Sequence, residues 1–286
     1  MNKQLLALIC ILFILMSCSD DKNSTKSSGR IFYPLSVGNT WTYYLESDFV
    51  IKDSENAIPV PMASDYHIKI ITNNKITLHD SIKVYELKSE ERLEQDSLTF
   101  HSYAYYNEDI YGLYQHAYLG TSHGFPKQIH NKTISFKGLR FSSAEHLARY
   151  FINLPARITN HVLSDSLYYE NPPLRVLKYP LEQDDEWIFR EPENPWAISK
   201  KVISENTTIN VTGGTFECYE IQVLFDLSDD GQWDDDIEYY EYYNSKGLIK
   251  KDMRFYGLIY TDINFPEPLG SFDLIQVMQL VEYEIE

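Results

Sequence analysis

An acidic segment at residues 226–236 has side chains whose types and spacing could hold a cation. It reads Asp-Leu-Ser-Asp-Asp-Gly-Gln-Trp-Asp-Asp-Asp, with oxygen-bearing side chains at positions one, three, five and nine and glycine at six. This is the first part of a calcium-binding loop, although position twelve is Ile237 instead of a carboxylate. The alternative is a solvated acidic hairpin turn. The pattern predicts a calcium site with a backbone carbonyl near Gln232 and four side-chain ligands, Asp226, Ser228, Asp230 and Asp234.

Two other patterns indicate catalytic or metal chemistry more weakly. Residues 120–124 read Gly-Thr-Ser-His-Gly, which matches the elbow of α/β-hydrolases around a nucleophilic Ser122. That elbow requires a helix immediately after the turn, whereas Pro126 follows here. Eight histidines lie between His67 and His161, but none has the one-turn helical spacing of a zinc enzyme. We therefore interpret these residues as parts of loops and sheets. The sequence predicts no catalytic residue and favours a protein that is not an enzyme.

The N-terminus has the three-part layout of a secretory signal, with Lys3, an apolar run to Met16 and the small Ser17 before Cys18. The apolar run is too short to span a bilayer. Leu-Met-Ser-Cys resembles the bacterial lipobox, whose cysteine is acylated after cleavage. We predict that residues 1–17 are removed and that Cys18 carries the lipid, palmitate among its acyl chains, that attaches the protein to a membrane. The alternatives are a cleaved signal with a chance cysteine and an uncleaved anchor helix.

The residues after Cys18 are polar and offer nothing to bury, so 18–30 should form a flexible tether. Cys-Ser-Asp-Asp-Lys resembles the acidic export tag of surface lipoproteins of the Bacteroidota. The resemblance implies a protein attached to the outer membrane and displayed at the cell surface.

The composition of the chain excludes some partners. Its formal charge is −17, and removal of residues 1–17 takes away one lysine, leaving −18. Nucleic acid is an unsuitable partner because its phosphates would be repelled. After loss of Cys10 and acylation of Cys18, Cys218 has no disulfide partner. The fold must therefore be stabilised by a packed core.

An internal repeat organises the chain, because two sets of motifs occur in the same order. Tyr-Pro-Leu, five residues, Trp, one residue and an aromatic residue occur at 33–43 and at 179–189, an offset of 146. Further matches join 69–74 to 201–206, 84–87 to 218–221, 105–107 to 242–244 and 112–113 to 247–248. We interpret the chain as two copies of one unit, with Trp41 equivalent to Trp187 and Tyr85 equivalent to Tyr219.

Each copy is expected to be an antiparallel β unit, because its apolar residues alternate and glycine turns separate the runs. One helix is expected at 143–153, ended by Pro155 and covering the sheets. The predicted organisation is a first β unit at 31–140, a helical linker at 141–178 and a second β unit at 179–286. The predicted fold class is mainly β, with tandem antiparallel units that form a curved sheet or half-barrel.

The tyrosine clusters near 103–106 and 239–243 could stack against sugars, but their equivalent places in the two copies favour packing. Together, the Tyr-Pro-Leu motif, Gly214-Thr-Phe-Glu-Cys-Tyr219 and Tyr242-Tyr243 followed by Gly247-Leu-Ile resemble a group of uncharacterised exported β-proteins and lipoproteins of Gram-negative bacteria. The first copy departs from the second motif at 80–85. The resemblance implies sheets similar to the half-barrel of lipoprotein-carrier proteins, and it implies no catalytic activity.

The sequence therefore predicts an envelope lipoprotein that acts as a non-catalytic binding or scaffold module. It does not identify the ligand, and it leaves apolar and glycan ligands open. The alternative is a surface-attached hydrolase or glycan-processing accessory protein. A pair of carboxylates or a Ser-His contact in a cleft would favour the alternative. A concave face lined by aliphatic and aromatic side chains would favour an apolar ligand.

Overall fold

The computed structural model describes residues 31–52, 65–79, 81–94, 99–120, 132–141, 147, 167–190, 197–262 and 267–286. These residues form a single antiparallel sheet of fourteen strands. Its strands are β1 (Thr40–Ile51), β2 (Tyr66–Leu78), β3 (Ile82–Leu93), β4 (Thr99–Asp109), β5 (Gly112–Gly120), β6 (Lys132–Phe136), β7 (Leu139–Phe141), β8 (Tyr168–Lys178), β9 (Glu186–Arg190), β10 (Ala197–Val211), β11 (Gly214–Asp226), β12 (Ile237–Asn244), β13 (Gly247–Asp262) and β14 (Gly270–Glu284).

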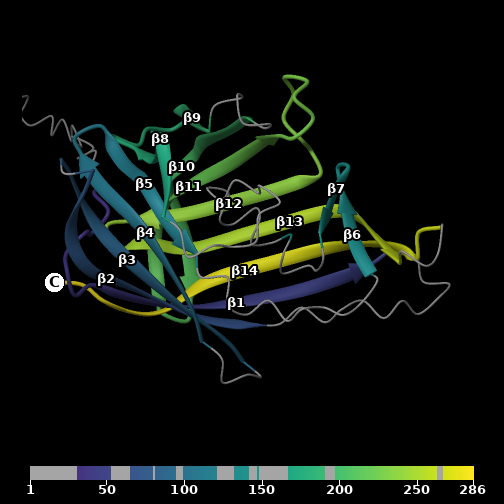
Figure 1. Ribbon diagram of the computed structural model, residues 1–286, viewed down its shortest axis with the longest axis horizontal. Coiled ribbons are helices and arrows are strands. Elements are labelled where there is room, and N and C mark those ends of the chain that lie inside the picture. The colour runs from purple at the N-terminus through teal and green to yellow at the C-terminus, as the bar shows by residue number, and fades with distance from the viewer. Residues whose placement is uncertain are drawn as a thin grey trace, which may run out of the picture.

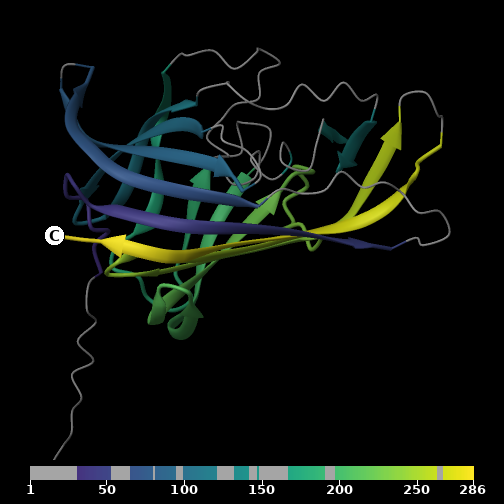
Figure 2. The same ribbon diagram turned by 90° about the horizontal axis from the view of Figure 1, so that it is seen from below.

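The fold class is mainly β, as predicted, and the sheet curves into an almost closed barrel (Figures 1 and 2). The hydrogen-bonded order is β8-β5-β4-β3-β2-β1-β14-β13-β12-β11-β10-β9. The short β6–β7 hairpin lies off this path and pairs with the end of β13. The two end strands, β8 and β9, contact each other where the barrel closes (Figure 1).

The strand order is the same in the two halves that carry the repeated motifs. The first half runs β1-β2-β3-β4-β5-β8 and the second runs β9-β10-β11-β12-β13-β14. The two halves meet at two places, where β14 pairs with β1 and where β8 contacts β9. The tryptophan of the repeated motif lies in the first strand of each half, β1 or β9.

Register supports most of the predicted equivalences. Tyr85 lies opposite Tyr106, and Tyr219 lies opposite Tyr243. The hydroxyl of Tyr105 donates to Glu86 at 3.2 Å, and the hydroxyl of Tyr242 donates to Glu220 at 3.4 Å. These tyrosines therefore make the same packing contact in both halves.

Two predicted equivalences are wrong by two residues. Leu248 lies opposite Tyr243, but the residue opposite the equivalent Tyr106 is Gln115 and not Leu113.

The second error concerns β2 and β10. Trp41 lies opposite Ile70, whereas Trp187 lies opposite Lys200. Ile70 is therefore equivalent to Lys200 and not to Val202, as the match of 69–74 with 201–206 had implied. Thr72 lies opposite Leu87 as Val202 lies opposite Ile221, so the offset between β2 and β10 is 130 here and not 132.

The predicted helical linker at 141–178 is wrong for its last eleven residues, which form β8. Here the aromatic and aliphatic residues of 168–178 pair with β5, and Pro172 and Pro173 are tolerated because β8 ends the hydrogen-bonded order. Of the predicted helix at 143–153, only Leu147 lies within the described residues; it is helical and fully buried. The other predicted boundaries stay predictions.

Two core clusters fill the interior. The first core cluster is centred on fully buried residues of β1, β10, β11, β13 and β14, namely Trp41, Tyr43, Val202, Cys218, Ile221, Ile249 and Leu280. The second core cluster lies under β6 and β7 and is centred on Leu147, Met253, Phe255, Leu258 and Leu274. In β1 the alternation of buried and partly exposed residues directs Trp41, Tyr43 and Leu45 into the first cluster. Among the residues that the structure describes, no helix is long and apolar enough to cross a membrane.

We predict that Trp41→Ala lowers the free energy of unfolding by about 3–5 kcal/mol, because it empties a fully buried site and removes the indole bond to the carbonyl of Lys246. Denaturant unfolding would measure the change. Trp233→Ala is the matched control, since Trp233 is 43% exposed and its loss should cost less than about 0.5 kcal/mol. Similar small losses in both variants would contradict the assignment of Trp41 to the core.

Candidate functional site

A row of polar side chains crosses the inner face of the sheet between the two core clusters. In β10, Lys200 lies between Ile198 of the second cluster and Val202 of the first. In four other strands, too, a polar residue lies between an apolar residue that packs in one core cluster and an apolar residue that packs in the other. We call this row the polar belt; its members are Ser47 in β1, Lys200 in β10, Glu241 in β12, Lys251 in β13 and Gln276 in β14.

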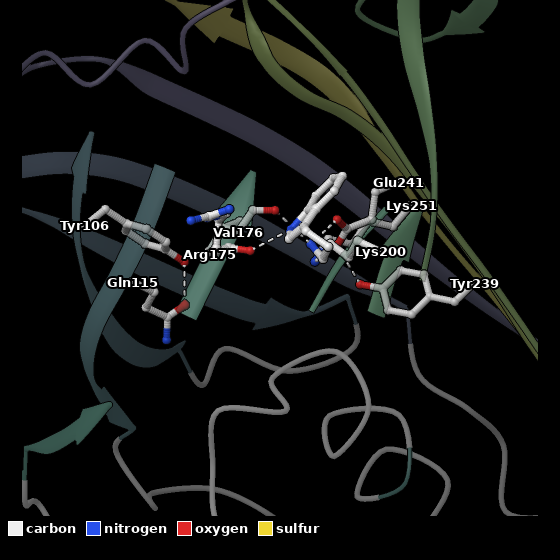
Figure 3. Close-up of polar contacts among 9 residues, drawn as sticks. Tyr106, Gln115, Arg175, Val176, Lys200, Tyr239, Glu241 and Lys251 are labelled. Atoms are coloured by element: carbon white, nitrogen blue, oxygen red, sulfur yellow. Dashed lines mark hydrogen bonds and ion pairs between the residues drawn. The ribbon is translucent and has the colours of Figure 1, made fainter. Parts of the chain in front are cut away.

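A buried ion pair forms the centre of the polar belt (Figure 3). The Lys200 ammonium donates to Glu241 Oε2 at 2.6 Å, and both side chains are at most 5% exposed. The hydroxyl of Tyr239 donates to Glu241 Oε1 at 3.0 Å. Lys251, directly opposite Glu241 in the ladder, places its ammonium 3.5 Å from the same oxygen. One carboxylate thus contacts two ammonium groups in a low-dielectric interior.

Burial and the surplus of positive charge set the pKa values of the side chains in this group. Burial alone would raise the pKa of the Glu241 carboxyl, but the ammonium groups of Lys200 and Lys251 outweigh it and hold that pKa at about 2. Burial also lowers the pKa of Lys251, against the attraction of Glu241. Burial and the charge of Glu241 raise the pKa of Tyr106, whose hydroxyl donates to Gln115 at 2.9 Å (Figure 3). Glu241 is therefore a carboxylate throughout the neutral range.

The polar belt adjoins the seam, by which we mean the contact between β8 and β9. These strands are the two ends of the hydrogen-bonded order, and side chains join them. Lys200 donates to the carbonyl of Val176 at 3.2 Å (Figure 3). The Trp187 indole donates to the carbonyl of Arg175 at 2.9 Å. Two ion pairs add to them, Arg190–Glu170 at 3.1 Å and Lys178–Asp185 at 2.6 Å.

The charged pair occurs in only one of the two halves. By register, Ile70 occupies the place of Lys200 in the first half. Ala104 lies opposite Leu87 as Glu241 lies opposite Ile221, so Ala104 takes the place of the glutamate. The same scaffold is therefore built once with a buried ion pair and once without it. Nothing in the strand order requires these charges.

Sequence reasoning missed the polar belt. Its residues lie in strands whose other inward positions are apolar, and a charged residue at an inward position, such as Glu241 within Tyr-Tyr-Glu-Tyr-Tyr, was the available signal. That signal could not be interpreted without the strand order, because Lys200 and Glu241 are 41 residues apart.

Of the predicted calcium ligands, Asp226 ends β11, and Ser228, Asp230 and Asp234 lie in the loop between β11 and β12. The carboxylate oxygens of Asp226 and Asp234 have other partners. The two carboxylate oxygens of Asp226 accept from the backbone of Asp230 and Gly231. Asp234 accepts from the backbone of Leu227 and pairs with Lys137 at 2.8 Å. Among the described residues, no three His, Cys, Asp or Glu side chains are grouped as a metal site would need. Calcium binding by this loop stays a prediction.

The other sequence candidates divide between described and undescribed parts of the chain. His116 contacts Asn107 at 2.9 Å, and burial lowers its pKa. The His79 ring packs on Tyr169 with 4.0 Å between centroids. Tyr105, Tyr239, Tyr242 and Tyr243 are buried, as packing residues should be. Cys18 and Ser122 lie outside the described residues.

Comparisons with known proteins add two distant structural likenesses. No family model and no curated protein matches this chain. A Bacteroides fragilis protein, presumed to be exported and described as having a YmcC-like fold, is 10% identical, with coverage of 89% of this chain and 99% of that one and a TM-score of 0.38. A presumed lipoprotein from Parabacteroides distasonis is 12% identical, with the same coverage and a TM-score of 0.36. Neither likeness assigns a function to this chain.

We predict that Lys137 and calcium compete for the loop, because both neutralise Asp234. Thermal unfolding in EDTA and in millimolar calcium should show a larger stabilisation by calcium for Lys137→Ala than for the wild type. The double variant Asp226→Ala with Asp230→Ala is the control and should not respond. If neither the wild type nor Lys137→Ala responds to calcium, the loop is a solvated acidic turn.

Proposed function

We propose that this protein is an envelope lipoprotein, anchored to the outer membrane through the lipid on Cys18, that acts as a non-catalytic binding module. The lipobox and the polar tether support the anchor, and the acidic residues after Cys18 support display at the cell surface. The ligand site is the polar belt on the inner face of the curved sheet.

One observation supports the binding role. The second half of the sheet buries an ion pair, whereas the first half has uncharged residues at the equivalent positions. Lys200 and Glu241 take the positions of Ile70 and Ala104. Burying an ion pair seldom stabilises a fold more than apolar residues of similar size would. Charges retained at such a cost therefore support a role in recognition.

The surroundings of the belt support a ligand that is partly apolar. Aliphatic and aromatic side chains of the two core clusters flank the belt on both sides. At the seam, side-chain bonds take the place of a backbone ladder, so the barrel can separate there at a smaller cost than between laddered strands. In the part of the chain that the structure describes, Glu241 is engaged by lysines, and no observation favours the hydrolase alternative.

Mass spectrometry of the protein purified from its own host membranes tests both parts of this proposal. We expect the denatured chain to begin at Cys18 and to carry the mass of acyl chains. We expect the native protein to retain a ligand that the triple variant Lys200→Met, Glu241→Leu, Lys251→Met loses, because this variant removes every charge of the belt. Cys18→Ser should leave the membrane fraction, yet should retain the ligand.

The two parts can fail separately. A Cys18→Ser variant that stays in the membrane fraction would contradict the lipid anchor. A native protein that carries no ligand, or one whose ligand the triple variant retains equally, would contradict binding at the polar belt. Arg254→Met is a suitable control, because Arg254 is 45% exposed and pairs with Glu238 and Asp252 away from the belt.

A further inference from the structure

The polar belt is interrupted between Lys251 and Gln276. On one side, Lys200 is satisfied by Glu241, by the carbonyl of Val176 and by the Phe189 ring 4.8 Å away. On the other side, the Gln276 amide nitrogen donates to Ser47 at 2.8 Å. The carbonyl oxygen of the Gln276 side chain is buried and has no hydrogen-bond partner. A buried acceptor without a hydrogen-bond partner costs free energy. A ligand that donates a hydrogen bond to this oxygen would remove that cost.

Lys251 is the least satisfied charge of the belt. Its only contacts in the group are Glu241 Oε1 at 3.5 Å and the Tyr239 ring at 5.9 Å. An ammonium has three protons to donate, so Lys251 has donors to spare. Its side chain is 14% exposed, compared with 4% for Lys200 and 5% for Glu241. A ligand can therefore reach Lys251 more easily than the ion pair behind it.

The free donors and the free acceptor lie close together. Lys251 is opposite Met278 and Gln276 is opposite Met253, so the two residues are diagonal neighbours on adjacent strands. Diagonal neighbours on one face are about 7–8 Å apart, so a single small ligand can contact both side chains. The two lysines and one glutamate of the belt leave one positive charge unbalanced.

We propose that the gap between Lys251 and Gln276 binds a small oxyanion that also carries a hydroxyl group, such as a hydroxycarboxylate or dihydrogen phosphate. The anionic oxygens accept from Lys251 and balance the surplus charge. The hydroxyl donates to the side-chain oxygen of Gln276. This inference rests on the proposed binding function and gives the chemistry of the ligand at the polar belt.

Thermal unfolding of the mature lipoprotein in detergent, at constant ionic strength, tests the inference with glycolate, inorganic phosphate and acetate as probes. Chloride is the reference. The unfolding midpoint of the wild type should rise with the concentration of glycolate, phosphate or both. Acetate has no hydroxyl to offer Gln276 and should bind at least about tenfold more weakly than glycolate. A response to glycolate alone identifies a hydroxycarboxylate, and a response to phosphate alone identifies the phosphate ion.

Two variants and one control locate the site. Lys251→Met should abolish the response to every probe, and it should fold because Lys200 still balances Glu241. Gln276→Leu should reduce the affinity for glycolate to that for acetate. Lys250→Met is the matched control, because the neighbouring Lys250 faces the other side of β13, where it pairs with Asp252 at 3.1 Å. Its response should equal that of the wild type.

Three results would overturn the inference: no midpoint shift with glycolate or phosphate, a shift with acetate as large as the larger of the shifts with glycolate and phosphate in the wild type, or an undiminished response in Lys251→Met. The proposed function fails on different evidence. A neutral ligand retained by the native protein and lost from the triple variant of Lys200, Glu241 and Lys251 would support binding at the belt and overturn its assignment to an anion.

Discussion

The contact between Lys200 and Glu241 joins the parts of this structure that the backbone leaves separate. The ammonium bonds to a carboxylate of β12 and to a backbone carbonyl of β8, so one side chain connects the second half of the sheet to the last strand of the first. It also lies between the two core clusters. Because the pKa of Glu241 is held at about 2 in the folded protein, this contribution is present above the usual value of 4.5 and is lost as pH falls through about 2.

The position of this pair follows from how the two halves meet. Each half is a meander of six strands. The first strand of the first half, β1, pairs with the last strand of the second half, β14, along a full ladder. The other junction, β8 with β9, is made by side chains. An open sheet edge would expose unpaired backbone groups. Here the carbonyls of Arg175 and Val176 accept from Trp187 and Lys200, which cover part of that edge.

The sequence predicted what local patterns control. Alternation and glycine turns predicted the β class, and the paired tyrosine motifs predicted the equivalence of Tyr85 with Tyr219, because residues that pack alike in both halves keep the same types. The match of 69–74 with 201–206 failed because the residues that are truly equivalent, such as Ile70 and Lys200, differ in type, so side-chain types did not reveal the register. The helical linker failed at 168–178 because tertiary pairing with β5 decided the conformation of β8.

The candidate site could not be predicted in the same way. A lysine in β10 and a glutamate in β12 become partners only after the sheet has curved and the order of its strands is known. The acidic loop attracted attention because its ligands are close in sequence, yet its carboxylates are engaged by backbone amides and by Lys137, which comes from the distant β6–β7 turn. Spacing along the chain is therefore a better guide to strands than to buried charges.

A double-mutant cycle at Lys200 and Glu241, followed by denaturant unfolding at pH 7, tests the central claim most directly. Glu241→Leu leaves two buried ammonium groups without a carboxylate and should cost about 3–5 kcal/mol, and Lys200→Met should also be destabilising. The double variant Lys200→Met, Glu241→Leu should recover most of this loss, with a coupling energy of at least about 2 kcal/mol. Additive losses in the double variant would contradict the account, because they would show that the two charges do not act as a pair.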